Sequence, residues 1–203
     1  PMLVKLAYGR TGLAVDFPDG QTTVIEPTYL DGLPDQSAAI GDALRHPLSC
    51  PPLREVVSTG QTVAISVCDV TRPMPSATVL PVVLDALSHV PTTQIAILIA
   101  SGTHRATTHD ELVEMLGADI VARYRIVVHD AFDDAALVCL GEVDGRIPVW
   151  LNRVWTEADV RITTGFVEPH FFAGFSGGPK MVAPGLAGFK TIMRLHDAEM
   201  IRH

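Results

Sequence analysis

The sequence predicts an α/β fold with a mostly parallel sheet flanked by helices, and three observations support this prediction. From residue 61 onward, short apolar runs alternate with longer helical patterns, as expected for parallel strands joined by crossover helices. Residues 1–30 alternate in polarity between turn residues, which is typical of an antiparallel β meander. Of the 203 residues, 47% are hydrophobic, enough to bury a core in a single domain over residues 1–203.

The N-terminal segment is predicted to be this meander. The strands LVKLAY and LAVDF flank the turn GRTG, and a third strand, TTVIEP, follows the turn PDG. Two helices are expected next, over residues 36–46, where Pro47 stops the first, and over residues 52–58.

The core and the site are predicted over residues 61–203. VAISVCD, QIAILIA and RIVVHD are the first three strands, and DVRITTG is a fourth buried strand. Ser76 is expected to cap the helix after the first strand, and Thr108 with Glu111 forms a capping box for the next helix. LVCLGEV and RIPVWLN pair around the turn DG as a β-hairpin insertion, and a final helix covers residues 188–202.

Composition and charge exclude several classes of function. The formal net charge is −8 and the charged residues are interspersed, so the chain lacks the basic stripe that a nucleic acid partner requires. No apolar run is long enough to span a membrane, and the first residues alternate like a strand rather than a signal peptide. The three cysteines form no CxxC pair, which argues against a zinc knuckle or a disulfide framework and favours a reducing, cytoplasmic setting.

The residues that follow each predicted strand are the candidates for chemistry, because ligands of parallel sheets bind outside the carboxyl ends of the strands. After the first strand, a loop stiffened by prolines presents Asp69, Thr71 and Arg72. The guanidinium of Arg72 offers paired donors that match a carboxylate or a phosphate. An ion pair of Asp69 with Arg72 that holds the loop is an equally good interpretation.

His104 follows the second strand, between a glycine turn and the capped helix. Imidazole titrates near neutrality, which suits general acid–base catalysis, although a surface histidine in a loop is the simpler interpretation of this residue alone. His109, in the first turn of the helix, is expected to face solvent. His129 and Asp130, at the end of the third strand, are interpreted as structural.

The fourth strand leads into TTGFVEPHFFAGFSGGPKMVAPGLAGF, a stretch rich in glycine and aromatic residues. It contains Lys180, one of only three lysines in the chain. Apolar surroundings disfavour the charge of a lysine and make its amine a better nucleophile, and glycine backbone allows a phosphate to approach closely. A P-loop is the competing interpretation, but Pro179 separates Gly178 from Lys180 and no serine or threonine follows to hold magnesium.

The final predicted helix carries an apolar stripe formed by Phe189, Ile192, Met193, His196 and Met200. A histidine on such a stripe is expected to face inward and to need a partner. A satisfied core histidine is the common outcome, and a metal ligand is preferred only where other evidence calls for a metal.

The motifs DVTRP, SGTHR and EPHFFAGFSGGPK and the helix ending in MRLH resemble the nickel-dependent lactate racemase family in order, spacing and residue type. Together they span residues 69–196, and the combination of His170, Lys180 and His196 is the most specific part. The resemblance implies a racemase or epimerase of a small 2-hydroxy acid, with the catalytic residues on an α/β N-terminal domain.

The resemblance also implies a cofactor and roles for the site residues. In the family, a lysine carries a nicotinic-acid-mononucleotide derivative whose ring carbon and two sulfurs grip nickel as a pincer, and Lys180 matches that lysine. His196 is similar to the histidine that completes the nickel coordination, and His104 and His170 match the paired acid–base histidines. Arg72 resembles the anchor of the substrate carboxylate, and Asp69 is implied to hold Arg72 or the cofactor. The residues implied on the cofactor side are Asp69, Thr71, Ser176, Gly177 and Gly178.

The implied chemistry explains this set of residues. Removing the α-hydrogen of a hydroxy-acid anion as a proton would place carbanion charge beside a carboxylate. A lone histidine is too weak a base to remove that proton. In the implied hydride route, one histidine takes the hydroxyl proton while the α-hydrogen leaves as hydride to the pincer carbon, and the resulting 2-keto acid is re-reduced from its other face. A second histidine serves the reverse direction, and Arg72 retains the intermediate.

Family members continue into a second domain that closes over the site, whereas this sequence ends at His203. We therefore expect the C-terminal domain to be absent or supplied by a partner chain. The other expected partners are a small 2-hydroxy acid and a further copy of this chain. Two other functions stay open: a non-catalytic module that binds a phosphorylated small molecule through the SGGP loop and Arg72, and a zinc hydrolase in which His104, His170 and His196 hold the metal.

Overall fold

A computed structural model of the chain describes residues 1–26, 28–170 and 173–202. Parts of two predicted motifs, the last residue of TTVIEP and the aromatic pair of EPHFFAGF, lie outside the described residues. Contacts within the chain divide it into two compact units, residues 1–34 and residues 35–203.

The first unit contains an antiparallel hairpin of β1 (Met2–Leu6) and β2 (Leu13–Phe17), which confirms the first two predicted strands. The prediction of a third strand is wrong, because residues 22–26 form no strand. Val24 and Ile25 are adjacent and both are exposed, so the alternation of polarity that a half-buried strand needs is broken there.

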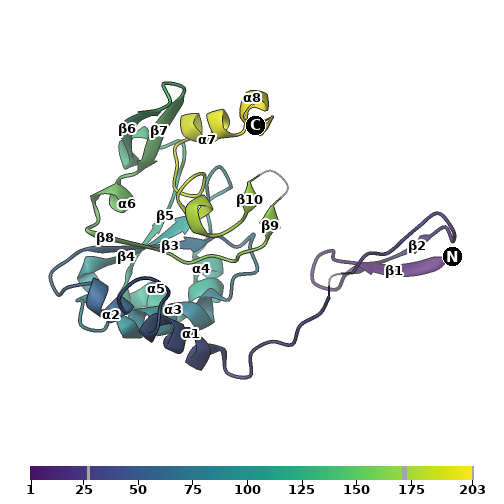
Figure 1. Cartoon of the computed structure of the whole chain (residues 1–203), viewed down its shortest axis with the longest axis horizontal. Helices are drawn as coiled ribbons and strands as arrows, with labels where there is room; N and C mark the ends of the chain where they lie inside the picture. The colour runs from purple at the N-terminus through teal and green to yellow at the C-terminus, as the bar shows by residue number, and fades with distance from the viewer. Residues whose placement is uncertain (27, 171–172, 203) are drawn as a thin grey trace. The chain divides into compact units, whose positions relative to one another are not determined.

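The second unit is built on a four-stranded parallel sheet in the order β5-β4-β3-β8 (Figure 1), which confirms the predicted fold class. Its strands are β3 (Val63–Cys68), β4 (Ile95–Ala100), β5 (Arg125–Val128) and β8 (Val160–Thr163). β3 and β4 are buried along nearly their whole length, as central parallel strands require. β8 corrects the prediction of a fourth buried strand, because it lies at the sheet edge and alternates between half-buried and exposed residues.

Helices cover one face of this sheet (Figure 1). They are α1 (Gln36–Arg45), α2 (Leu53–Val56), α3 (Ser76–Ala86), α4 (His109–Leu116) and α5 (Ala118–Arg123), with a 3-10 turn, η1 (Thr92–Gln94), before β4. The core beneath them packs Ile65 and Ile97 of the sheet with Leu80 and Leu116 of the helices, and none of these four is more than 1% exposed. Within the described residues, no helix has the length and apolar character needed to cross a membrane.

The two predicted helix starts have different outcomes. The capping box of Thr108 and Glu111 is present at the start of α4, with both reciprocal hydrogen bonds formed. Ser76 does not cap α3 as predicted, because the helix begins at Ser76 itself and Pro75 occupies the position before it. The proline fixes the entry of the chain into the helix without a side-chain cap.

The opposite face of the sheet carries the hairpin insertion and the C-terminal elements. β6 (Leu137–Val143) and β7 (Ile147–Asn152) pair antiparallel as predicted, with a bulge between Cys139 and Glu142, and α6 (Arg153–Glu157) follows. The core on this face includes Leu98, Trp155 and Leu186. Shorter elements are η2 (Asp134–Ala136), β9 (Pro169–His170), β10 (Gly174–Phe175) and η3 (Gly178–Met181).

The predicted final helix over residues 188–202 is divided into α7 (Phe189–Leu195) and α8 (Ala198–Ile201). Asp197 has an extended backbone, with φ −76° and ψ 161°, and its carboxylate accepts a hydrogen bond from the backbone N–H of Met200 at 2.9 Å. Asp197 therefore caps α8 instead of continuing α7.

His129 lies at the carboxyl end of β5 and is buried, with 2% exposure. Its Nε2 donates to the carbonyl oxygen of Ala187 at 2.9 Å, so Nδ1 of the neutral ring accepts from the side-chain amide of Asn152 at 3.2 Å. Burial lowers the pKa of His129. The neutral ring links β5 to β7 and to the segment before α7, which agrees with the structural interpretation of this residue.

Folding stability should fall as the pH drops below about 6.5, in part through His129. Since the folded-state pKa lies below the unfolded value, the contribution of the neutral ring is complete above the unfolded pKa and is lost as the pH falls toward the folded pKa. Replacing His129 with glutamine should flatten this part of the stability profile by up to about 1.4 kcal/mol per pH unit.

Urea unfolding between about pH 5 and 8 measures this slope. His109→Gln, at the exposed first position of α4, is the matched control. Equal slopes for His129→Gln and the unchanged chain would contradict the assignment.

Candidate active site

The loops at the carboxyl ends of β3, β4 and β8 surround one cavity of about 420 Å³. Asp69 and Arg72 follow β3, His104 follows β4, and the long segment after β8 contributes the remaining wall. Parallel strands end at the same edge of a sheet, so residues from three distant parts of the sequence meet there.

Asp69 and His104 form a closely bonded pair in the cavity wall. Nδ1 of His104 lies 2.6 Å from one carboxylate oxygen of Asp69, and the hydroxyl of Thr71 donates to the other at 2.6 Å. Asp69 is 5% exposed, whereas His104 is 47% exposed. A buried carboxylate needs such donors, and the pairing places the lone pair of the neutral His104 ring on Nε2.

Arg72 is positioned differently from the expectation that Asp69 holds it. Among the described residues, the ion-pair partner of Asp69 is His104. Nη1 of Arg72 lies 3.3 Å from the hydroxyl oxygen and 3.4 Å from the carbonyl oxygen of Thr71. The buried carboxylate is already occupied by shorter bonds, so the guanidinium of Arg72 lines the cavity instead.

Arg105 and Glu111 hold the loop that carries His104. The two terminal nitrogens of Arg105 lie 2.8 and 2.5 Å from the two carboxylate oxygens of Glu111, which also accepts from the backbone N–H of Thr108 at 2.9 Å. The hydrogen bond from Arg105 lowers the pKa of Glu111 to about 2. A bidentate ion pair therefore closes the loop immediately after His104.

Lys180 lies on η3, next to the carboxyl end of β3. The following residue, Met181, is buried, and its carbonyl oxygen accepts from the hydroxyl of Ser66 on β3 at 2.9 Å. Partial burial lowers the pKa of Lys180, and the positive charge of Arg72 lowers it further. The surroundings of this lysine therefore disfavour its charged form.

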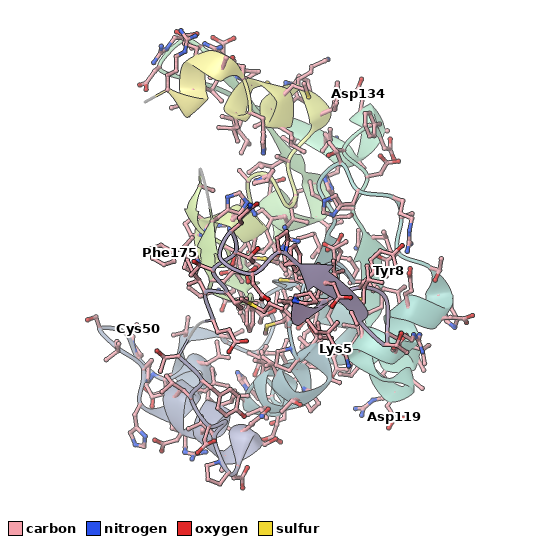
Figure 2. The ribbon with its side chains drawn as sticks, turned by 90° about the vertical axis from the view of Figure 1, so that its right-hand side faces the viewer. Lys5, Tyr8, Cys50, Asp119, Asp134 and Phe175 are labelled. Carbon is pink, nitrogen blue, oxygen red and sulfur yellow. The ribbon has the colours of Figure 1, made fainter. Side chains whose placement is uncertain are left out.

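The loop before Lys180 brings glycine backbone to the cavity. Ser176 is buried and donates to the carbonyl of Phe166 at 2.6 Å while accepting from the backbone N–H of Glu168 at 3.0 Å. Gly177 has a φ of 71°, and an added Cβ would lie 3.2 Å from the Phe166 carbonyl oxygen. Phe175 on β10 points outward into solvent and is 64% exposed (Figure 2).

His170 lies on β9 and is half-buried in the cavity wall. The backbone N–H of Ala173 donates to its Nδ1 at 3.2 Å. Desolvation lowers the pKa of His170, and the positive charges of Lys180 and Arg72 lower it further. The lowered pKa favours the neutral ring, in which Nδ1 carries the lone pair that accepts from Ala173 and Nε2 carries the proton.

His196 caps the carboxyl end of α7. Its Nδ1 donates to the carbonyl oxygen of Ile192 at 2.8 Å, which places the lone pair of the neutral ring on Nε2. This is the arrangement typical of metal-ligating histidines. His196 is exposed at the helix end and lines the cavity instead of packing in the core. Of the predicted stripe, Ile192 is 6% exposed and Met193 52%.

Most of the predicted site residues share the cavity wall. They are Asp69, Arg72, His104, His170, Ser176, Gly177, Lys180 and His196. Thr71 reaches the site through its hydrogen bond to Asp69, and Gly178 lies beside Gly177 at the start of η3.

Cys68 also lines the cavity, and the sequence analysis missed it. Its thiol lies 3.5 Å from the sulfur of Met181, and burial raises its pKa. Its place as the last residue of β3 was the available signal, because strand ends were already the expected location of the site.

The structure lends no support to a three-histidine zinc site. Across residues 1–26, 28–170 and 173–202, no group of three or more His, Cys, Asp or Glu side chains is placed to hold a metal ion. The zinc interpretation required His104, His170 and His196 to converge on one ion.

Comparison with known proteins identifies clear relatives. The family model described as lactate racemase N-terminal domain matches residues 8–203. A lactate racemase from Lactiplantibacillus plantarum is 38% identical over 203 residues, and one from Thermoanaerobacterium thermosaccharolyticum is 33% identical over 205 residues. Each alignment covers 98% of this chain and 48% of the relative, so the chain spans about half the length of the curated relatives it matches.

Solved structures agree with these relatives. The lactate racemase apoprotein from Thermoanaerobacterium thermosaccharolyticum matches with a TM-score of 0.82 at 33% identity, covering 100% of this chain and 48% of that chain. A protein from Thermotoga maritima matches with a TM-score of 0.67 at 27% identity, covering 83% of this chain and 42% of that chain.

Lys180 should react with amine-directed reagents at lower pH than Lys5, which is exposed on β1. A lowered pKa leaves a larger fraction of the amine neutral at a given pH, and the neutral amine is the nucleophile. Trinitrobenzenesulfonate labelling across a pH series, followed by peptide mass spectrometry, measures the pH of half-maximal rate for each lysine. If the two lysines show the same dependence of labelling rate on pH, the expectation is contradicted. The pH of half-maximal rate is compared instead of the rate itself, because the rate also depends on how accessible each lysine is.

Proposed function

We propose that this chain, which belongs to the lactate racemase N-terminal domain family, is the half of a racemase or epimerase of a small 2-hydroxy acid that bears the catalytic residues. The observation that carries the proposal is the convergence of Arg72, His104, His170, Lys180 and His196 on one cavity. Since the chain spans 48% of its curated relatives, we propose that a second domain or a partner chain completes the protein. The three free cysteines support a reducing, cytoplasmic location.

The residues of the cavity fit the nickel pincer nucleotide, which we propose as the cofactor. Lys180 offers an amine of lowered pKa for a covalent link, and the backbone of Gly177 offers a surface that a phosphate approaches closely. Nε2 of His196 offers a nitrogen ligand for nickel, with Nδ1 held by a backbone carbonyl. When bound, this group supplies an electrophilic carbon that accepts a hydride from the substrate.

The remaining side chains perform binding and proton transfer in this proposal. Arg72 holds the substrate carboxylate through paired guanidinium donors and so orients the α-carbon. Nε2 of His104 takes the hydroxyl proton, while Asp69 holds the opposite ring nitrogen and stabilises the imidazolium that forms. His170, whose pKa is lowered by desolvation and by neighbouring cations, serves the other enantiomer.

The covalent link to Lys180 is the most direct test. Co-expression with the enzymes that make the pincer nucleotide should add its mass and nickel to the chain, and Lys180→Ala should abolish both. Lys190→Ala, which replaces another lysine ten residues away in the sequence, should retain both. Intact mass spectrometry and elemental analysis provide the readout.

An unmodified mass for the unchanged chain would overturn the proposal. Binding of a phosphate ester without added mass or nickel would instead favour the non-catalytic binding module. Mass addition that persists in Lys180→Ala would place the link on another residue.

Asp69→Asn should lower kcat for interconversion of the lactate enantiomers by about 10²- to 10⁴-fold in the cofactor-loaded protein, with a small effect on KM. The amide lacks the charge that stabilises the imidazolium of His104, and its N–H can donate to Nδ1, which moves the ring proton to Nε2. Nitrogen chemical shifts of the His104 ring should report the altered tautomer. Asp130→Asn, at an exposed position after β5, is the control. An unchanged kcat in Asp69→Asn would count against a catalytic role for the pair of Asp69 and His104.

A further inference from the structure

The segment that joins Lys180 to the helix of His196 lies along the edge of β7. Ala187 forms a β-bridge with Leu151, and the backbone N–H of Gly188 donates to the carbonyl of Trp150 at 2.8 Å. One residue pair further, the N–H of Asn152 donates to the carbonyl of Leu186 at 2.9 Å. An isolated β-bridge thus joins the hairpin insertion to the cavity-forming segment.

Thr191 continues this pairing where the backbone has turned into α7. Its hydroxyl donates to the carbonyl of Pro148 at 2.7 Å and accepts from the backbone N–H of Trp150 at 2.9 Å. The side chain is 2% exposed, so both bonds are shielded from water. A single hydroxyl therefore satisfies two backbone groups of β7 and fixes the first turn of α7 against the strand.

The contacts leave this segment little room to shift. A Cβ added to Gly188 would lie 2.7 Å from Leu137 and 3.0 Å from Trp150, so the segment and the hairpin are in close contact. On its other side, the N–H of Phe189 donates to the carbonyl of Ala131 at 2.8 Å. The start of α7 is held between the hairpin and the loop after β5.

The connection from Thr191 to His196 is short and direct. Ile192, the residue after Thr191, is 6% exposed, and its carbonyl accepts the Nδ1 proton of His196 at 2.8 Å. A displacement of the first turn of α7 would move this carbonyl and rotate the imidazole that depends on it.

We propose that Thr191 is a positioning residue that fixes α7 on β7 and thereby aims Nε2 of His196 into the cavity. The inference rests on the proposed function, in which His196 is the protein ligand of the nickel. It gives the hairpin insertion a role, because β7 becomes the rigid edge that sets the distance between the cofactor-bearing lysine and the metal-binding histidine.

The experiment compares Thr191→Val and Thr191→Ser in the protein loaded by co-expression. Valine keeps the shape but removes both hydrogen bonds, and serine restores them. Thr156→Val is the matched control, because the hydroxyl of Thr156 donates only within α6, to the carbonyl of Arg153 at 3.0 Å. The readouts are the mass on Lys180, the nickel content, and the rate of nickel loss to excess chelator.

Thr191→Val should carry the mass on Lys180 but lose nickel about 10- to 100-fold faster, the usual cost of removing an outer support of a metal ligand. In the cofactor-free chain, hydrogen exchange at the Trp150 amide should accelerate about tenfold. Thr191→Ser and Thr156→Val should match the unchanged protein in both measurements. Thr191→Cys, which keeps the volume with a weaker donor, replaces the valine variant if that variant does not fold.

If Thr191→Val loses nickel at the same rate as the unchanged protein, the positioning role is overturned while the proposed function stays intact. A lower melting temperature with unchanged nickel loss would have the same meaning, since it shows structural support alone. Absence of both mass and nickel from the unchanged protein would remove the proposed function, and the positioning role with it.

Discussion

The parallel pairing of β3 with β4 and with β8 is the constraint on which the rest of the site depends. The register sets Cys68 opposite Ala100 and Ser66 opposite Thr163, so the three strands finish at one edge of the sheet. Two of these strands are buried on both faces, so a one-residue slip in register would exchange the side chains of the two cores and disrupt the packing of both. The positions of the loops that follow them are therefore set by the burial of the core.

The cavity concentrates positive charge in a protein whose net charge is −8. Lys180 and Arg72 lie close enough for the guanidinium to lower the pKa of the amine, and both cations act on His170. The buried carboxylate of Asp69 is bonded to His104 and Thr71 rather than to these two cations. An anionic ligand relieves the repulsion between the cations, so the electrostatics favour a carboxylate or a phosphate in the cavity.

The sequence predicted those features that depend on local pattern. Continuous apolar runs identified the central strands, and Thr108 with Glu111 identified a helix start, because both signals lie within a few residues. The features that were missed depend mostly on neighbours distant in sequence. β8 lies at a sheet edge, although the alternation of Val160 and Ile162 with Arg161 and Thr163 was a local signal against a fully buried strand. The partner of Asp69 was missed for the same reason, since His104 is 35 residues away. The break between α7 and α8 was missed because the apolar periodicity concealed Asp197, which is the N-cap of α8.

The bulge in the hairpin insertion affects whether β6 can pair with a strand of a neighbouring molecule. β7 is covered by the segment leading to α7, whereas among the described residues the outer side of β6 pairs with no further strand. Leu140 and Val143 on β6 are 55% and 50% exposed, a combination that invites a strand from a neighbouring molecule. The bulge between Cys139 and Glu142, with Gly141 at φ 103°, interrupts the row of backbone donors and acceptors there. This irregularity opposes strand addition and the aggregation that would follow from it.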